Sequence, residues 1–369
     1  MPLKIADRCS SRDNNFNALR LVAASLVVFG HSWSLTGSGK DPIHAATGYS
    51  SGSIGLAVFF TISGFLITGS AMANSPARFM WLRSLRIFPA LAVVVAFETF
   101  VVGPIFYGGS ALEYITQRGS WAHLKNVSLF WGGFTIPGVF ENNPLRGVNG
   151  STWTLPVEFT LYALAMIAAA SGLLHRKAFP TILIAAGALF VYSSIRGFYF
   201  PGNVGPELVN KVAVYPLARW GTFFALGAAM WVYRERIVLD PGIAFCALFA
   251  LIISKTLWDF TYFVCGAYLT IYIALACRPV MSSFFLSTDV SYGLYIFAWP
   301  VQQWIIATIA WAMNPWLLAL VALPISMLIG FASWNLIEKP ALRLRHWLPN
   351  RRPHHSPPTT SNGGIQSMA

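Results

Sequence analysis

The sequence predicts an all-α, polytopic membrane protein with about ten transmembrane helices. Of its 369 residues, 56% are hydrophobic and only 10% are charged, whereas soluble proteins carry about 25% charged residues. Aromatic residues make up 15% of the chain, as expected where Trp and Tyr mark both membrane interfaces. Several apolar segments have about the length that a bilayer requires. They lie near residues 19–36, 53–73, 87–107, 152–172, 178–195, 214–233, 242–257, 260–277, 290–311 and 315–337.

The distribution of basic residues predicts the orientation of these spans. If the N-terminus is cytoplasmic, seventeen lysines and arginines lie on the cytoplasmic side and seven on the other, as the positive-inside rule requires. Both termini are then cytoplasmic. We expect a cytoplasmic segment at 1–18, one membrane domain at 19–345 and a disordered cytoplasmic tail at 346–369, which is rich in Pro, Ser and Thr. The largest outer segment, at about 108–151, could shape an acceptor site.

Composition also excludes several classes of function. The net charge is +12, but the basic residues flank apolar spans instead of forming one patch, so nucleic-acid binding is not indicated. The four cysteines show no CxxC or Cys/His ligand spacing, so neither a disulfide framework nor a metal site is predicted. No internal repeat is evident, which counts mildly against a secondary transporter, since transporters are often built from repeated halves.

The first span contains the most informative pair, Arg20 and His31. Eleven helical steps of 100° end about 20° beyond three whole turns, so both side chains share one helix face. They lie roughly 16 Å apart, with Arg20 at a membrane edge and His31 near mid-bilayer. A deep ionisable residue marks a functional site by default, and the spacing suits a long ligand with an anionic end at Arg20 and a reacting end at His31. Alternatively, His31 is a satisfied polar side chain between helices.

Two more arginines stand at the cytoplasmic mouth of the third span, in the sequence RSLRIFP from Arg83 to Pro89. Arg83 and Arg86 are three residues apart and share a helix face. Two guanidinium forks suit a phosphate-bearing ligand, and together with Arg20 they would form a tribasic entry for an anionic co-substrate. The alternative is that they only anchor the topology of the span.

The second and fourth spans supply further polar candidates. Ser63 and Gly64 permit close helix approach, and we favour this structural role over catalysis by Ser63. Glu158 and Tyr162 are four residues apart on one face of the fourth span. Glu158 could meet His31 in the outer half of the bilayer and stabilise its imidazolium, as the acid of a catalytic triad does. The alternative is a structural pair between Glu158 and Arg219.

Two late segments are expected to have structural roles. SYGLYIFAWP, from Ser291 to Pro300, is expected to supply packing and interfacial residues. WNLIEKP, from Trp334 to Pro340, ends the last span, and its Glu338 and Lys339 are expected to anchor the chain at the membrane interface.

The order of these segments resembles membrane acyltransferase family 3, whose members O-acetylate bacterial surface polysaccharides, O-antigens and Nod factors. The similarity runs from about residue 14 to 345, and six short motifs in order make it specific. One departure is that Ala298 stands where many members place a histidine, which leaves His31 as the only deep histidine. The matching motifs are Arg20-(x10)-His31, FFxxSGF at Phe59–Phe65, RxxRIxP at Arg83–Pro89, WTLxxExxxY at Trp153–Tyr162, SYxxY at Ser291–Tyr295 and Glu338-Lys339-Pro340.

The resemblance implies an integral enzyme of the bacterial cytoplasmic (inner) membrane, surrounded by membrane lipids. It would move an acyl group, usually acetyl, from cytoplasmic acetyl-CoA to a hydroxyl of a carbohydrate or glycolipid, with no permanently bound cofactor. Direct transfer and an acyl-histidine intermediate both fit the residues. By motif position, the resemblance carries over His31 and Glu158 as catalytic residues and Arg20, Arg83 and Arg86 as residues that bind acyl-CoA. We also predict that Trp153, Tyr162 and Ser63 bind substrate.

Two other classes of function remain open from the sequence. A transporter or flippase for an anionic or sugar-lipid substrate would use His31 and Glu158 as a proton relay, but it would not explain the cytoplasmic arginine pair. A membrane scaffold protein would show no turnover.

Overall fold

The described part of the chain is all-helical, as predicted. A computed structural model describes residues 2–9, 13–129, 132–195, 214–254, 258–279, 288–309 and 314–348. Within these ranges the only extended pairings are two isolated β-bridges, Lys4 with Val238 and Tyr107 with Val139. The tail predicted at 346–369 lies almost entirely outside the described residues.

Among the residues that the structure describes, five helices are long and apolar enough to cross a membrane. The third includes α5 (Pro76–Phe97), a π-helical turn (Glu98–Val102) and α6 (Gly103–Phe106). The fourth contains α9 (Thr154–Ala170), and the last contains α18 (Pro315–Ser333), a π-helical turn (Trp334–Glu338) and α19 (Lys339–Arg343). The five are α2 (Phe16–Leu35), α4 (Ser51–Ala73), Pro76–Phe106, Ser151–Ala170 and Pro315–Trp347.

The remaining predicted spans also contain helices. Together with the five long helices, every predicted span has a helical counterpart, whereas the number of crossings and the side of the termini stay predictions. These other helices are α10 (Phe179–Ile195), α12 (Val214–Val232), α13 (Pro241–Ile253), α14 (Trp258–Thr261) with α15 (Ala267–Leu275), and α17 (Ser291–Thr308).

The third span begins earlier than predicted. We placed its start at residue 87, but α5 begins at Pro76, directly after its N-cap Ser75. The difference arises because three arginines lie in the first turns of α5 and lower its apolarity, although proline at the first helical position is a favourable start. As a consequence, Arg83 and Arg86 lie in the second and third turns of α5 and not at its very start, and they share a helix face as predicted.

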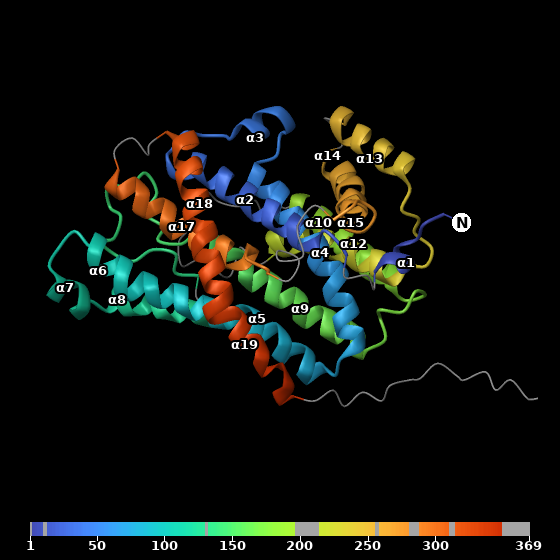
Figure 1. Cartoon of the computed structure of the whole chain (residues 1–369), viewed down its shortest axis with the longest axis horizontal. Coiled ribbons are helices and arrows are strands. Elements are labelled where there is room, and N and C mark those ends of the chain that lie inside the picture. The colour runs from blue at the N-terminus through green and yellow to red at the C-terminus, as the bar shows by residue number, and fades with distance from the viewer. Residues whose placement is uncertain are drawn as a thin grey trace, which may run out of the picture.

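Helix α4 lies at the centre of the bundle and packs against α2, α9 and α12 (Figure 1). The close contact with α12 depends on Gly64, because a Cβ atom built there would lie 1.9 Å from the carbonyl oxygen of Phe224. The close helix approach predicted at this position is therefore confirmed. Helix α2 also packs against α17 and α18, while α5 packs against α9 and α19, the C-terminal helix.

Short helices after α6 form one end of the molecule (Figure 1). They are α7 (Ala111–Thr116) and α8 (Arg118–Ala122), followed by a 3₁₀ turn at His123–Ser128. The buried side chain of Glu98 ties this segment to the third span, because it binds Nε2 of His123 at 2.8 Å and accepts a hydrogen bond from Asn149 at 2.7 Å.

Candidate active site

A cavity of about 360 Å³ opens among α2, α4, α5, α9, α17 and the C-terminal helix. Part of its wall is apolar, formed by residues such as Leu56, Phe59 and Ile87. The rest is polar, with four arginines against two carboxylates. This excess of positive charge favours an anionic ligand. The charged residues that line the cavity are Arg20, Arg83, Arg86, Arg345, Glu158 and Asp289.

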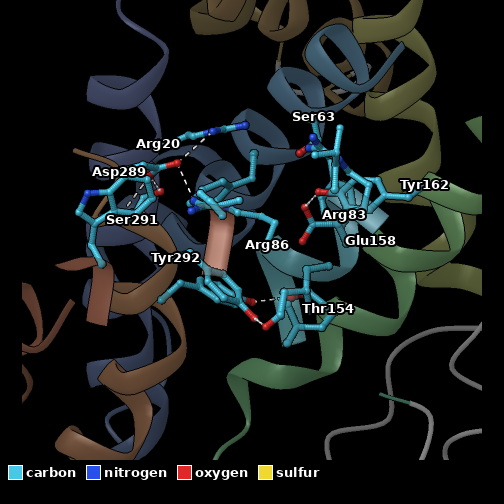
Figure 2. Close-up of a pocket in the computed structure, with 18 of the residues that line it drawn as sticks. Arg20, Ser63, Arg83, Arg86, Thr154, Glu158, Tyr162, Asp289, Ser291 and Tyr292 are labelled. Atoms are coloured by element: carbon cyan, nitrogen blue, oxygen red, sulfur yellow. Dashed lines mark hydrogen bonds and ion pairs between the residues drawn. The ribbon is translucent and has the colours of Figure 1, made fainter. Parts of the chain in front are cut away.

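One side of the cavity is an ion-pair network centred on Asp289 (Figure 2). Asp289 Oδ2 accepts from Arg20 Nη1 at 3.1 Å and from Arg86 Nη2 at 2.6 Å. Arg86 uses Nη1 to bind Glu338 Oε2 at 2.9 Å. Burial by itself would raise the pKa of Asp289, but the guanidinium groups of Arg86 and Arg20 and the hydrogen bonds from Ser291 lower that pKa to about 2. Asp289 is therefore ionised at neutral pH.

Arg83 lies on another side of the cavity, next to Glu158, Tyr162 and Ser63 (Figure 2). Its Cζ atom lies 6.0 Å from the ring centroid of Tyr162 and 5.9 Å from that of Phe79. Arg83 forms no ion pair with any residue that the structure describes, and its buried Nε has no hydrogen-bond partner. A buried guanidinium without a counter-ion is costly, so this side chain is suited to an anionic ligand.

Glu158 and Tyr162 both line the cavity, one turn apart on α9. The phenol of Tyr162 donates a hydrogen bond to Oε1 of Glu158. The alternative pairing of Glu158 with Arg219 is not formed. Instead, Arg219 donates to the hydroxyl of Tyr215 at 3.0 Å and lies 3.5 Å from a carboxylate oxygen of Asp259.

His31 does not line this cavity. It lies eleven residues beyond Arg20 on α2, roughly 16 Å along the axis, where its ring packs edge-on against Trp299 with centroids 4.7 Å apart. Its buried Nδ1 has no hydrogen-bond partner. The predicted contact with Glu158 is absent, since Glu158 bonds to Tyr162 at the level of Arg83. Trp153 is also outside the cavity lining and packs, partly buried, against the hydrophobic core.

One face of α17 connects the cavity with His31. Tyr292, Tyr295 and Trp299 follow at helical spacings of three and four and so share a face. The first two line the cavity, and the third contacts His31. The tyrosine hydroxyls are held in place, since Tyr292 donates to the carbonyl of Ile87 at 2.8 Å and Tyr295 to that of Ser151 at 2.9 Å.

Sequence reasoning missed part of this site. Glu338 was expected to anchor the chain at the interface, but that is wrong: its side chain is 1% exposed and binds Arg86. The sequence held a signal for this role, because a carboxylate at the end of an apolar run is costly to bury unless a cation pairs with it. The segment from Ser291 to Tyr295 was assigned to packing, yet Ser291, Tyr292 and Tyr295 line the cavity, as does Asp289 just before them.

The fold and this cavity define a helical membrane protein with a positively charged binding site. Residues 13–335 match the model of a known acyltransferase domain. The chain therefore belongs to acyltransferase family 3 and is an acyltransferase, as the resemblance implied.

Two relatives match over nearly their whole length. One, named O-acetyl transferase, from Shigella phage Sf6, is 31% identical and covers 89% of this chain and 96% of its own. The other, Nodulation protein 10 from Rhizobium leguminosarum bv. viciae, is 29% identical and covers 94% of this chain and 98% of its own. No solved structure matches the chain.

Proposed function

We propose that the protein is an O-acyltransferase that moves an acyl group, in the simplest case acetyl, from cytoplasmic acyl-CoA to a hydroxyl of a cell-surface or exported carbohydrate. The observation that carries the proposal is the positively charged cavity with the unpaired Arg83. The name of the phage relative, O-acetyl transferase, supports acetyl as the group transferred. The predicted cytoplasmic orientation places Arg20, Arg83 and Arg86 on the side where acyl-CoA is found.

In this proposal the arginines hold the phosphates of the donor. Charge-assisted hydrogen bonds from guanidinium forks suit phosphate oxygens. The acyl arm extends from the cavity along α2 and past the Tyr292–Tyr295–Trp299 face of α17 to His31. Its length matches the Arg20-to-His31 separation in order of magnitude.

His31 acts as general base in the proposed reaction. Its unpartnered Nδ1 and its depth in the bundle suit a group that exchanges protons with bound substrate. The acceptor oxygen attacks the thioester carbonyl while its proton passes to His31. The new C–O bond then replaces the C–S bond, and the CoA thiolate leaves and takes the proton. Trp299 holds the imidazole ring edge-on.

Glu158 and Tyr162 act at the cavity wall next to Arg83. We infer that their mutual hydrogen bond keeps the carboxylate from forming an ion pair with Arg83, which leaves the guanidinium available to the donor. Ser63 lies on α4 at the same level and is placed to contact the bound donor. The role predicted for Glu158 in orienting His31 would require the two side chains to approach when substrates bind.

Label transfer tests this proposal directly. Purified protein in lipid nanodiscs is incubated with acetyl-CoA labelled in the acetyl group and with glycans extracted from a bacterial envelope. We expect the label to appear on the glycan and free CoA thiol to be released in equal amount. If the label stays on CoA while the protein is folded, the proposal is wrong and a transporter of anionic substrates becomes the better explanation.

A further inference from the structure

Both carboxylate oxygens of Asp289 accept hydrogen bonds. Oδ1 accepts from the hydroxyl and the backbone N–H of Ser291, at 2.5 and 3.3 Å. Oδ2 accepts from Arg20 and Arg86. Because Ser291 is the first residue of α17, the start of this helix fixes the carboxylate, and the carboxylate in turn fixes two guanidinium groups from two other helices.

Arg86 is restrained from its other side as well. Its second terminal nitrogen binds Glu338, whose Oε1 accepts from Ser333 at 3.0 Å. The guanidinium lies between the rings of Tyr292 and Trp334, with Cζ 5.5 and 5.6 Å from their centroids. Glu338 is fully buried behind this arrangement, whereas Asp289 faces the cavity.

Arg20, Arg83 and Arg86 therefore differ in whether a carboxylate neutralises and orients them. Arg20 and Arg86 are neutralised and oriented by a shared carboxylate, while Arg83 has no counter-ion among the described residues. Without Asp289, two like charges would face each other across a partly dry cavity and would move apart. Holding flexible side chains in the binding geometry before the ligand arrives raises affinity, because less conformational entropy is lost on binding.

We propose that Asp289 is a positioning residue for acyl-donor binding. It holds Arg20 and Arg86 opposite Arg83, so that three guanidinium groups surround the phosphates of the donor, and Ser291 holds Asp289. This inference rests on the proposed function, since it assigns a residue to the recognition of acyl-CoA. Asp289 itself does not touch the reacting atoms.

Binding of two acyl donors distinguishes a positioning role of Asp289 from a general structural role. Acetyl-CoA carries phosphates, whereas S-acetyl-pantetheine has the same reacting thioester without them. For Asp289→Asn we expect the affinity for acetyl-CoA to fall about tenfold or more, the affinity for S-acetyl-pantetheine to stay unchanged, and turnover at saturating acetyl-CoA to stay near that of the wild type. Ser291→Ala keeps the backbone hydrogen bond and should show a smaller loss of the same kind.

A matched control is Glu235→Gln, which removes a carboxylate from an exposed ion pair with Arg176. This variant should bind both donors like the wild type. Equal acetyl-CoA affinity in the wild type and Asp289→Asn would overturn the inference, as would tighter binding or an equal loss for both donors. If Asp289→Asn does not fold, Ser291→Ala decides, because an unchanged ratio of the two affinities overturns the inference. Wild-type protein that binds neither donor would instead overturn the proposed function.

Discussion

At the scale of single residues, the three predicted donor-binding arginines carry different partners. Arg83 has none among the described residues, whereas Arg86 neutralises Glu338, a side chain that is 1% exposed. Sequence spacing placed both arginines on one face of α5, and the structure brings both to the cavity. The spacing could not distinguish the two arginines, because the carboxylates that pair with Arg86 come from segments about 200 and 250 residues further along the chain.

This difference leads to a prediction for the two arginines. Arg83→Gln should weaken acetyl-CoA binding, because it removes a charge-assisted contact worth roughly 1.5–3 kcal/mol, and should not lower thermal stability, since no buried carboxylate loses its partner. Arg86→Gln should lower stability by about 3–5 kcal/mol, since it leaves a buried carboxylate uncompensated. Acetyl-CoA titration and thermal unfolding in nanodiscs measure both effects.

Lysine variants provide the control for this pair. Arg83→Lys should restore donor affinity only partly, because an ammonium group cannot reproduce the bidentate fork. Full restoration by lysine, or unchanged donor affinity in Arg83→Gln, would show that Arg83 is only a topology anchor.

At the scale of elements, hydropathy predicted the helices well and their ends less well. Every predicted span contains a helix, but α5 begins eleven residues before its predicted start, because its arginines resemble a flanking loop. The sequence also gave no indication of the network around Glu98. Its partners His123 and Asn149 lie in an irregular segment, where neither helical nor strand periodicity applies.

We expect the hydrogen-bond network around Glu98 to stabilise the fold and to have no part in donor binding. Glu98→Leu removes the partner of His123 Nε2 and one of two acceptors of the Asn149 amide, and a buried unsatisfied polar group costs about 1–3 kcal/mol. We expect a lower unfolding temperature together with unchanged acetyl-CoA affinity, because Glu98 does not line the cavity. Wild-type stability in this variant would contradict the assignment.

The contact between α4 and α12 gives a second prediction at this scale. Gly64→Val should prevent correct packing, since even a Cβ atom at this position overlaps the backbone of Phe224. We expect little folded protein by size-exclusion chromatography. Gly187→Val on α10, where nothing lies within 4 Å of the added atom, is the matched control and should fold. Normal yields of Gly64→Val would show that the helices can separate without penalty.

At the scale of the whole molecule, the site forms where helices distant in sequence meet. Composition and charge predicted the fold class, and motif order predicted the family. The convergence of six of the eight predicted site residues on one cavity depends on helix packing, and so does the separation of His31 and Trp153 from it. The spacing of Arg20 and His31 nevertheless predicted that they would share a helix and lie far apart along it.

The charge of the cavity predicts how donor binding depends on salt. Four arginines against two carboxylates attract the donor phosphates, and partly exposed charges are screened as ionic strength rises. The affinity for acetyl-CoA should fall as salt increases, while that for S-acetyl-pantetheine should change little. Parallel titrations at low and high salt check this, and an equal response of the two donors would argue against phosphate recognition.

In the proposed mechanism, donor binding and proton transfer take place at two separate sites along α2, the arginine cavity and His31. Acetyl transfer and acetyl-CoA affinity measured side by side in His31→Ala test this separation. Loss of a general base lowers the rate by about 10²–10⁴, so we expect transfer to be nearly abolished while acetyl-CoA affinity stays at the wild-type value. Transfer close to the wild-type rate in this variant would contradict the claim.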